Sequence, residues 1–208
     1  MISDNKKFIF IHIPKNGGTS IQEMLLDYLN CSYEYNNDIG LIKFKDEYGT
    51  KKHSSLLKIT KAIGRKNIRK YYKFTVVRNP YDRFISMYFW ALKYKYRINQ
   101  SIQEVLMRND KINYNYAKEI ISMDFARPQT RWLKVCNKIK IDYIIRLENI
   151  QDGWNYVCNK INIPNSVVPK LNSNKHGYYG KYYYNELKEL IDNFYSEDFT
   201  NFYYEKRI

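Results

Sequence analysis

The chain has 208 residues, of which 35 are Lys or Arg and 21 are Asp or Glu, so its formal net charge is +14. Hydrophobic residues make up 44% of the chain, with 22 tyrosines among them, which suffices for one packed core and excludes an intrinsically disordered chain. The 5 Pro and 8 Gly exclude collagen-like and Pro/Gly-rich classes. The charge predicts a surface that attracts anions, whether nucleotides, nucleic acid, acidic glycans or lipid headgroups, without choosing among them.

The cysteines and the N-terminal segment bear on the compartment. Cys31, Cys136 and Cys158 are too few and too scattered for a disulfide framework or a zinc site, so we expect reduced thiols, no metal and a cytoplasmic protein. No stretch reaches the roughly 18 apolar residues of a membrane span. The apolar run Phe8 to Ile13 is shorter than the core of a signal peptide, and no small-residue cleavage site follows it. We therefore expect a strand there and no signal peptide.

Strands and helices are predicted to alternate in the first half of the chain. Lys7 to Ile13 form an apolar run that ends before Pro14, which suits a buried parallel strand. The pairs Thr19…Gln22 and Ser20…Glu23 fit capping boxes at the start of a helix. The apolar positions of that helix recur at helical spacing, at Ile21, Met24, Leu25, Tyr28 and Leu29.

The alternation continues towards the C-terminus. A second buried strand, rich in aromatic and β-branched residues, is predicted over Tyr72 to Val77, and a third over Ile141 to Leu147. Further helices are predicted over Leu56–Ile63, Phe84–Leu92, after a capping box at Ser101…Glu104, around Trp154–Cys158, and over Leu187–Phe194 with Asn185 as the cap.

These elements predict an α/β fold with a P-loop-like central parallel sheet flanked by helices. Because no repeat, linker or composition break interrupts the chain, we expect a single domain over residues 1–208. Such sheets bind ligands at the carboxyl ends of their strands. The loops at 14–19 and 78–86 both follow predicted strands and are the first candidates for a binding site.

The loop from Pro14 to Ser20, PKNGGTS, has the layout of an anion site. Its glycines let the backbone curl around an oxyanion, the N–H groups and the helix dipole favour negative charge, and Lys15 can reach a phosphate oxygen. The hydroxyls of Thr19 and Ser20 can donate hydrogen bonds to other phosphate oxygens. Lys15 precedes Gly17 and Gly18, whereas a Walker A loop carries its lysine after the glycines, so this is not a Walker A loop. Taken alone, the segment also fits a plain strand-to-helix turn with a surface lysine.

The segment IHIPKNGGTSI resembles the loop, HIPKTGGTS in its common form, that binds the 5′-phosphosulfate in sulfotransferases that use 3′-phosphoadenosine 5′-phosphosulfate (PAPS). The likeness holds best for the Golgi carbohydrate sulfotransferases, including the heparan 2-O-sulfotransferases, and for bacterial proteins with the same domain. Asn16 stands where Thr is usual, and we expect little effect because its backbone N–H is unchanged. The resemblance implies that PAPS is bound by Lys15, Asn16, Gly17, Gly18, Thr19 and Ser20.

The segment FTVVRNPYDRFISMY resembles the second motif of that family, which binds the 3′-phosphate of PAPS. Arg78 follows a predicted strand and Ser86 lies near the start of the next helix; a guanidinium fork with a hydroxyl suits a phosphate monoester. Pro80 and Asp82 would end the strand and begin the helix, and Arg83 is expected to be a salt-bridging or helix-surface residue. For Arg78 alone an ordinary ion pair is the simpler interpretation, but two matching motifs, each after a strand, favour a sulfotransferase.

A hydroxyl acceptor requires a general base with a pKa near the working pH, and the chain has 3 histidines. His53 lies between the two motifs, in the interval where the family has its catalytic histidine, and KHSSLLKI resembles that segment. The resemblance therefore implies that His53 is the base, while a polar residue before a helix is the ordinary alternative. Neighbouring Lys51 and Lys52 would disfavour a protonated imidazole. Lys15 would stabilise charge on the leaving phosphate, and His12 is expected to orient the loop.

The resemblance continues downstream and covers most of the chain. ARPQTRWL at 126–133 resembles a Q-x-x-W-L segment near the acceptor pocket, and IDYIIRLENI resembles the family's strand that ends in Arg-x-Glu-Asn. LNSNKHGYYGKYYY resembles the loop that closes over PAPS, whereas 31–50 shows no clear match and is open to carry acceptor specificity. The lid candidates are Asn172, Ser173 and Lys175, with Tyr178 or Tyr179 to stack on adenine, while His176 is either a surface residue or a lid residue.

Two other functions remain open from the residues. The charge, and the basic residues interleaved with tyrosine at 93–97 (KYKYR), fit a non-catalytic polyanion or nucleic-acid binder. A nucleotide kinase or other phosphotransferase on a related fold is disfavoured by the absent Walker A order and by the lack of a clear Mg²⁺-binding carboxylate near the loop.

The expected function is transfer of a sulfuryl group from PAPS to a hydroxyl, that of a carbohydrate acceptor, by in-line displacement with His53 as the base. The expected partner is a glycan or another hydroxyl-bearing acceptor, and no nucleic acid. Because no membrane anchor like that of the Golgi enzymes is found in the sequence, we expect a bacterial or viral protein of the cytosol. The acceptor and the oligomeric state are left open.

Overall fold

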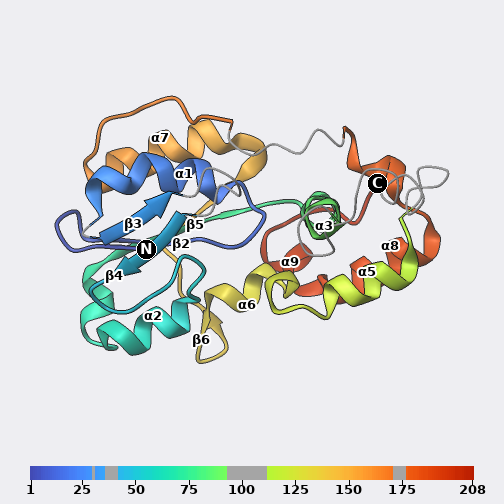
Figure 1. The fold of residues 1–208 in the computed structure, drawn as a ribbon, viewed down its shortest axis with the longest axis horizontal. Helices are drawn as coiled ribbons and strands as arrows, with labels where there is room; N and C mark the ends of the chain where they lie inside the picture. The colour runs from blue at the N-terminus through green and yellow to red at the C-terminus, as the bar shows by residue number, and fades with distance from the viewer. Residues whose placement is uncertain (30, 36–41, 93–111, 171–176) are drawn as a thin grey trace. The chain divides into compact units, whose positions relative to one another are not determined.

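The computed structural model describes residues 1–29, 31–35, 42–92, 112–170 and 177–208 (Figure 1). The chain divides into two compact units, unit 1 with Met1–Val77 and Thr130–Asn172, and unit 2 with Arg78–Gln129 and Ser173–Ile208. Every described strand belongs to unit 1, whereas the described part of unit 2 is helical.

Unit 1 contains a four-stranded sheet in the order β1-β2-β5-β8. The central strands β2 (Phe8–Ile11) and β5 (Tyr72–Val77) run parallel, and β8 (Tyr143–Arg146) pairs parallel with the other side of β5. The short strand β1 (Ile2–Ser3) pairs antiparallel with β2. The predicted α/β fold with a mostly parallel sheet is confirmed, and β1 is an addition that the sequence pattern did not indicate.

Helices cover both faces of this sheet. Because successive strand residues point to opposite faces, Phe8, Phe10 and Phe74 share one face. On that face they join one buried cluster with α1 (Gly18–Leu25) and α7 (Ile150–Ile161). Figure 1 shows α2 (Leu56–Ile63) on the other side of the sheet from α1 and α7. Burial on both faces explains why β2 and β5 read as continuous apolar runs.

Two hairpins complete unit 1. The strand β3 (Cys31–Tyr35) pairs antiparallel with β4 (Ile42–Asp46), and β6 (Lys134–Val135) with β7 (Lys138–Ile139). Asp46 closes the turn after β4, because its carboxylate accepts from the backbone N–H of Tyr48 at 3.1 Å and of Thr50 at 2.8 Å. This turn leads directly into the segment that carries His53. The 3₁₀ turns of unit 1 are η1 (Leu26–Tyr28), η2 (Asn67–Lys70) and η6 (Leu147–Asn149).

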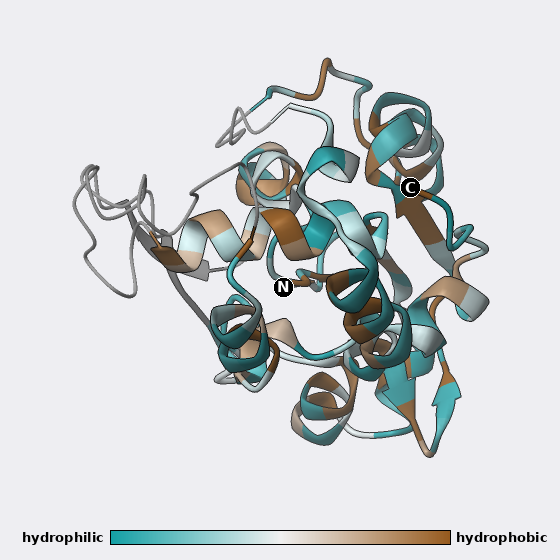
Figure 2. Ribbon diagram, turned by 90° about the vertical axis from the view of Figure 1, so that its right-hand side faces the viewer, coloured by the Kyte–Doolittle hydropathy of each residue, from teal (hydrophilic) through white to brown (hydrophobic). Residues whose placement is uncertain are grey.

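The described part of unit 2 consists of α3 (Pro80–Trp90), α5 (Tyr114–Ile121), α8 (Asn185–Phe194) and α9 (Ser196–Asn201), with the 3₁₀ turns η5 (Asp124–Ala126) and η7 (Tyr179–Tyr182). Apolar residues of these helices form one buried cluster around α3. Brown and teal turns alternate along the helices in Figure 2, as expected of helices that bury one face. The short helix α6 (Gln129–Leu133) carries the chain from unit 2 back into unit 1.

The predicted strands and helices are found within the described residues. The first and third predicted strands are shorter than expected, whereas α3, α7 and α8 begin before their predicted ranges. Two predicted caps are wrong. The helix α1 starts at Gly18 after a left-handed Gly17 without a side-chain cap, so Thr19 and Ser20 lie inside the first turn and form no capping box. Asn185 is likewise the first residue of α8 and does not cap it. The helix expected after Ser101 and the basic stretch at 93–97 lie outside the described residues. The expectation of a single domain stays a prediction.

Candidate functional site

The loop between β2 and α1 is held by its own side chains. Lys15 and Gly17 have left-handed backbone angles, with φ of 66° and 73°. Left-handed residues in such a loop turn successive N–H groups towards one side, which is typical of anion-binding concavities. The Asn16 amide is buried and donates to the carbonyl of Val76 at 2.7 Å, so it ties the loop to the end of β5. The sequence analysis considered only the backbone of Asn16 and missed this side-chain contact.

Two glycines of the loop are required by close packing. A Cβ on Gly17 would lie 2.5 Å from Cδ1 of Leu147, and a Cβ on Gly18 would lie 2.5 Å from Cδ2 of His12. The start of α1 therefore packs closely against Leu147 and His12. No side chain caps the N-terminus of this helix. The N–H groups of the first turn of a helix and the helix dipole both favour an anion at such a position.

His12 is almost completely buried at the end of β2. Its Nδ1 lies 3.0 Å from Oε1 of Gln22, and its ring stacks against that of Phe10 with centroids 5.6 Å apart. Burial lowers the pKa of His12 well below its ordinary value, and the charges of His53 and Lys52 act in the same direction. His12 is therefore a neutral side chain at neutral pH, and its expected role in orienting the loop stays a prediction.

His53 lies beside His12, at the edge of the same loop. Its Nδ1 is 2.8 Å from the carbonyl oxygen of His12, and the two rings meet edge to face with centroids 4.6 Å apart. Because a carbonyl only accepts, Nδ1 carries the proton of the neutral ring and Nε2 keeps the lone pair. Trp132 from α6 meets the ring of His53 edge-on at 6.4 Å. The arrangement gives the imidazole one fixed tautomer with Nε2 as its basic nitrogen.

The electrostatics of His53 agree in direction with the sequence analysis. Burial lowers its pKa to about 4, which is the largest effect, and the hydrogen bond to the His12 carbonyl opposes it. The positive charges of Lys52, the N-terminal amine and Lys15 lower the pKa of His53 further. The pKa of Lys52 is itself lowered by burial. The predicted influence of the neighbouring lysine is confirmed for Lys52, but burial contributes more.

Arg78 is the first residue of unit 2 and follows β5 directly. Its backbone N–H donates to Oε1 of Gln129 and its carbonyl accepts from Nε2 of the same side chain, each at 2.9 Å. Its Nε donates to the carboxylate of Asp82 at 2.7 Å. The expected helix start is confirmed, since Pro80 is the first residue of α3 and the Asn79 side chain caps Tyr81 N at 2.9 Å.

Gln129 is fixed in turn by Asp198, whose buried carboxylate accepts from the backbone N–H of Gln129 at 2.7 Å and from its amide at 3.3 Å. Asp198 thus fixes Gln129, and Gln129 in turn fixes the backbone of Arg78. Gln129 was noted in the sequence only as part of a Q-x-x-W-L segment, and its spacing gives no sign of this role.

Arg83 contradicts the expectation of a helix-surface residue. Its side chain is fully buried and donates to the carbonyls of Phe125, Ala126 and Arg127 at 3.1 to 3.5 Å. Burial lowers its pKa, and the ring of Tyr195 lies 5.7 Å from the guanidinium. Five N–H donors allow one guanidinium to satisfy several carbonyls of an irregular loop, which explains its burial.

The remaining candidates in unit 2 are placed as follows. Ser86 is buried on α3, within two turns of its start. Tyr179 stacks against Tyr81 at 6.4 Å, and its hydroxyl accepts from Asn79 at 3.3 Å, whereas Tyr178 is 64% exposed. The ring of Tyr178 is thus the more exposed of the two, and stacking on adenine stays a prediction. The lid candidates Asn172, Ser173, Lys175 and His176 lie outside the described residues.

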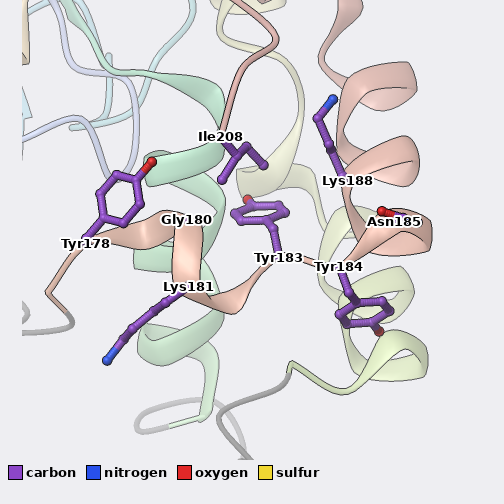
Figure 3. A pocket seen from close by; sticks show the side chains of 8 residues that line it. All are labelled: Tyr178, Gly180, Lys181, Tyr183, Tyr184, Asn185, Lys188 and Ile208. Atoms are coloured by element: carbon purple, nitrogen blue, oxygen red, sulfur yellow. The ribbon is translucent and has the colours of Figure 1, made fainter.

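A hollow of about 490 Å³ lies in unit 2, between η7 and the first turns of α8. In Figure 3 the ring of Tyr183 lies beside Ile208, and the ammonium group of Lys181 points away from the hollow. The hydroxyl of Tyr183 donates to the carbonyl of Tyr81 at 2.9 Å. Of the residues suggested by the sequence, Tyr178 lines this hollow, while the phosphate-loop residues and His53 belong to unit 1.

Three general features bear on the chemistry. Over the described ranges, no helix has the length and apolar character needed to cross a membrane. No group of three or more His, Cys, Asp or Glu side chains lies close enough to hold a metal ion, within the same ranges. Cys136 is exposed and Cys158 is buried, and both are free thiols.

The comparisons with known proteins give one match. The model described as the sulfotransferase family matches residues 1–205, which takes in the loops that follow β2 and β5, His53 and parts of both units. No curated protein and no solved structure matches the chain.

Proposed function

The chain belongs to the sulfotransferase family, and from this premise we propose that it transfers a sulfuryl group from PAPS to a carbohydrate hydroxyl in the cytoplasm, as a single domain. PAPS, when bound, would supply the sulfuryl group and a bisphosphate leaving group. The roles of the individual residues below are part of the same proposal.

The 5′-phosphosulfate would bind to the loop of Lys15 to Ser20. The left-handed turns at Lys15 and Gly17 and the start of α1, which has no side-chain cap, support this assignment. The backbone of Asn16, Gly17 and Gly18 and the hydroxyls of Thr19 and Ser20 would donate to oxygen atoms, and the ammonium group of Lys15 would stabilise the charge that develops on the leaving phosphate.

The observation that carries the proposal is the state of His53. A ring that is neutral at neutral pH, with Nδ1–H held by the His12 carbonyl, offers Nε2 to take a proton from an acceptor hydroxyl. A pKa of about 4 describes the protein without its anionic donor. A polyanion beside Lys15 would counter the positive charges around His53 and raise its pKa towards the working pH, where a base is most effective.

The 3′-phosphate would bind to Arg78 and Ser86. Asp82 orients the guanidinium through Nε, and Gln129 fixes the backbone of Arg78 on both sides. An arginine held in this way is preorganised for a bidentate contact with a phosphate. Ser173 and Lys175 are proposed to close over the nucleotide, on the strength of the motif alone.

The test is transfer of radiolabelled sulfuryl from PAPS to a set of neutral and acidic oligosaccharides, with a phenol and an amine as alternative acceptors. We expect labelled saccharide with the wild-type chain and none with His53→Ala, while both bind adenosine 3′,5′-bisphosphate with similar affinity because His53 is not a phosphate ligand. Label transfer that persists in His53→Ala would remove the assigned base. Wild-type protein that binds the nucleotide but labels only phenols or amines would contradict the carbohydrate acceptor.

A further inference from the structure

His12 contacts the proposed base twice. Its backbone carbonyl accepts from Nδ1 of His53 at 2.8 Å, and its ring lies edge to face with that of His53, with centroids 4.6 Å apart. The side chain of His12 is only 3% exposed. The orientation of His53 therefore depends on where the backbone and the ring of His12 are held.

The phosphate loop restrains His12 from the other side. A Cβ on Gly18 would come within 2.5 Å of Cδ2 and 2.8 Å of Nε2 of His12, so the imidazole fills the space that a side chain at position 18 would need. Because protein interiors are close-packed, a shift of this ring would require a shift of the start of α1.

Gln22, on the same helix, is the hydrogen-bonding partner of the ring. Its side chain is fully buried and its Oε1 lies 3.0 Å from Nδ1 of His12. The amide Nε2 has no hydrogen-bond partner among the described residues. A buried amide with one unsatisfied group destabilises a fold relative to an apolar side chain of similar size, so packing alone does not account for a glutamine here.

We propose that Gln22 is a positioning residue for His53, acting through His12; this inference rests on the proposed role of His53 as the base. Gln22 holds the ring of His12 between Gly18 and His53. The carbonyl of His12 then stays aligned with Nδ1–H of His53, and Nε2 remains the basic nitrogen. Without this restraint, His53 would sample both neutral tautomers, of which one presents the wrong nitrogen.

The test uses the full chain with Gln22→Met, which removes the amide and preserves the length and burial of the side chain. Nitrogen-15 NMR of the histidine side chains at neutral pH, without nucleotide, distinguishes the two neutral tautomers. We expect a single Nδ1–H tautomer for His53 in the wild type and a mixture in Gln22→Met. With PAPS and an acceptor, kcat should fall at least tenfold while KM for PAPS changes less.

Gln151→Met is the matched control. Gln151 lies on α7, where its amide accepts from Val168 N at 2.9 Å and donates to the Ser166 carbonyl at 3.0 Å. This change removes a glutamine that makes more hydrogen bonds than Gln22 but none with His12, so the His53 spectrum and turnover should stay as in the wild type. If Gln22→Met does not fold, Gln22→Asn serves instead, because its shorter side chain keeps the amide but withdraws it from His12.

The outcomes separate this inference from the proposed function. A wild-type tautomer for His53 in a folded Gln22 variant overturns the positioning role, whatever the activity. A changed tautomer in a chain whose wild type transfers no sulfuryl group supports the positioning role and contradicts the function. Loss of turnover with an unchanged His53 spectrum would also overturn the inference, because Gln22 would then act by another route.

Discussion

At the scale of single residues, His53 shows how neighbouring groups set both the tautomer and the charge of an imidazole. The hydrogen bond to the His12 carbonyl selects the tautomer, and burial with nearby positive charge keeps the ring neutral. These two effects act on different properties, the identity of the basic nitrogen and the pKa, so they can be tested separately.

The depressed pKa of His53 predicts a pH dependence of stability. Its pKa is about 4 in the folded protein and 6.5 as the ordinary value, so between these pH values the unfolded chain binds more protons. Stability from this group is therefore present above pH 6.5 and is lost as the pH falls towards 4. Wild type should lose about 2 kcal/mol more than His53→Gln between pH 7 and pH 5 in urea unfolding. Equal losses in both proteins would show that His53 titrates normally.

The groups around His53 that share this environment are His12, Lys52, Lys15 and the N-terminal amine. His53→Gln retains a donor for the His12 carbonyl, so the comparison removes the titration without removing the hydrogen bond. Lys52, Lys15 and the N-terminal amine remain in both proteins, whereas the titration of His12 shifts with the substitution, because His53 also lowers the pKa of His12.

Residues whose role depends on distant partners could not be predicted from the sequence. Arg83 was expected to be a salt-bridging or helix-surface residue, and its full burial was not foreseen. No local pattern reveals that three carbonyls of the 125–127 segment require a donor. The contacts from Asn16 to Val76 and from Gln129 to Arg78 span 60 and 51 positions, so they become visible only in the folded chain.

At the scale of elements, the junction of α7 with β8 is the tightest described contact between a helix and the sheet that involves a glycine. A Cβ on Gly153 would lie 2.7 Å from Cγ2 of Ile145. Helix propensity favours alanine over glycine by about 1 kcal/mol, while overpacking costs about 1 to 3 kcal/mol. Ile145 is β-branched and stiff at χ1, so it cannot easily move aside.

Gly153→Ala should therefore lower the free energy of unfolding by about 1 kcal/mol, although the change favours the helix. In an Ile145→Ala background the same change should raise it, because the obstructing methyl groups are gone. Urea unfolding of the wild type, the two single variants and the double variant gives the effect of Gly153→Ala on the free energy of unfolding in both backgrounds. Stabilisation by Gly153→Ala in the original background would mean that α7 stands further from β8.

The long, strongly patterned elements were predictable, and the short ones were not. The strands β2 and β5 and the helices α2 and α3 carry apolar runs or helical spacing over several residues, so the pattern was sufficient. The hairpin β6–β7 has two-residue strands, which leave little signal. The strands β3 and β4 alternate apolar and polar residues, a pattern that indicates a strand but that the sequence analysis did not use. The cap of α1 was missed because it depends on a left-handed glycine instead of a side chain.

At the scale of the whole molecule, each unit is assembled from two separate stretches of chain, and each interrupts the other. Neither unit can therefore be obtained as one continuous segment of the chain without including residues of the other unit. This interleaving predicts one cooperative unfolding transition, which also tests the expected single domain.

The 3 tryptophans allow the test, since Trp132 and Trp154 lie in unit 1 and Trp90 lies in unit 2. In Trp90→Phe, fluorescence reports on unit 1 alone, while circular dichroism reports on both units. The two urea transitions should coincide. Separate midpoints would show that the units unfold independently and would contradict the single domain.

The charge of +14 attracts any polyanion, so the central claim is the selection of one nucleotide and not the strength of binding. The most direct measurement is calorimetric titration with adenosine 3′,5′-bisphosphate, ADP and 5′-AMP at moderate salt, for the wild type and Arg78→Ala. We predict that the wild type binds the bisphosphate far more tightly than both controls. Arg78→Ala should lose about 2 kcal/mol, roughly 30-fold, for the bisphosphate and little for 5′-AMP. Equal, weak binding of all three that fades with salt would contradict the account.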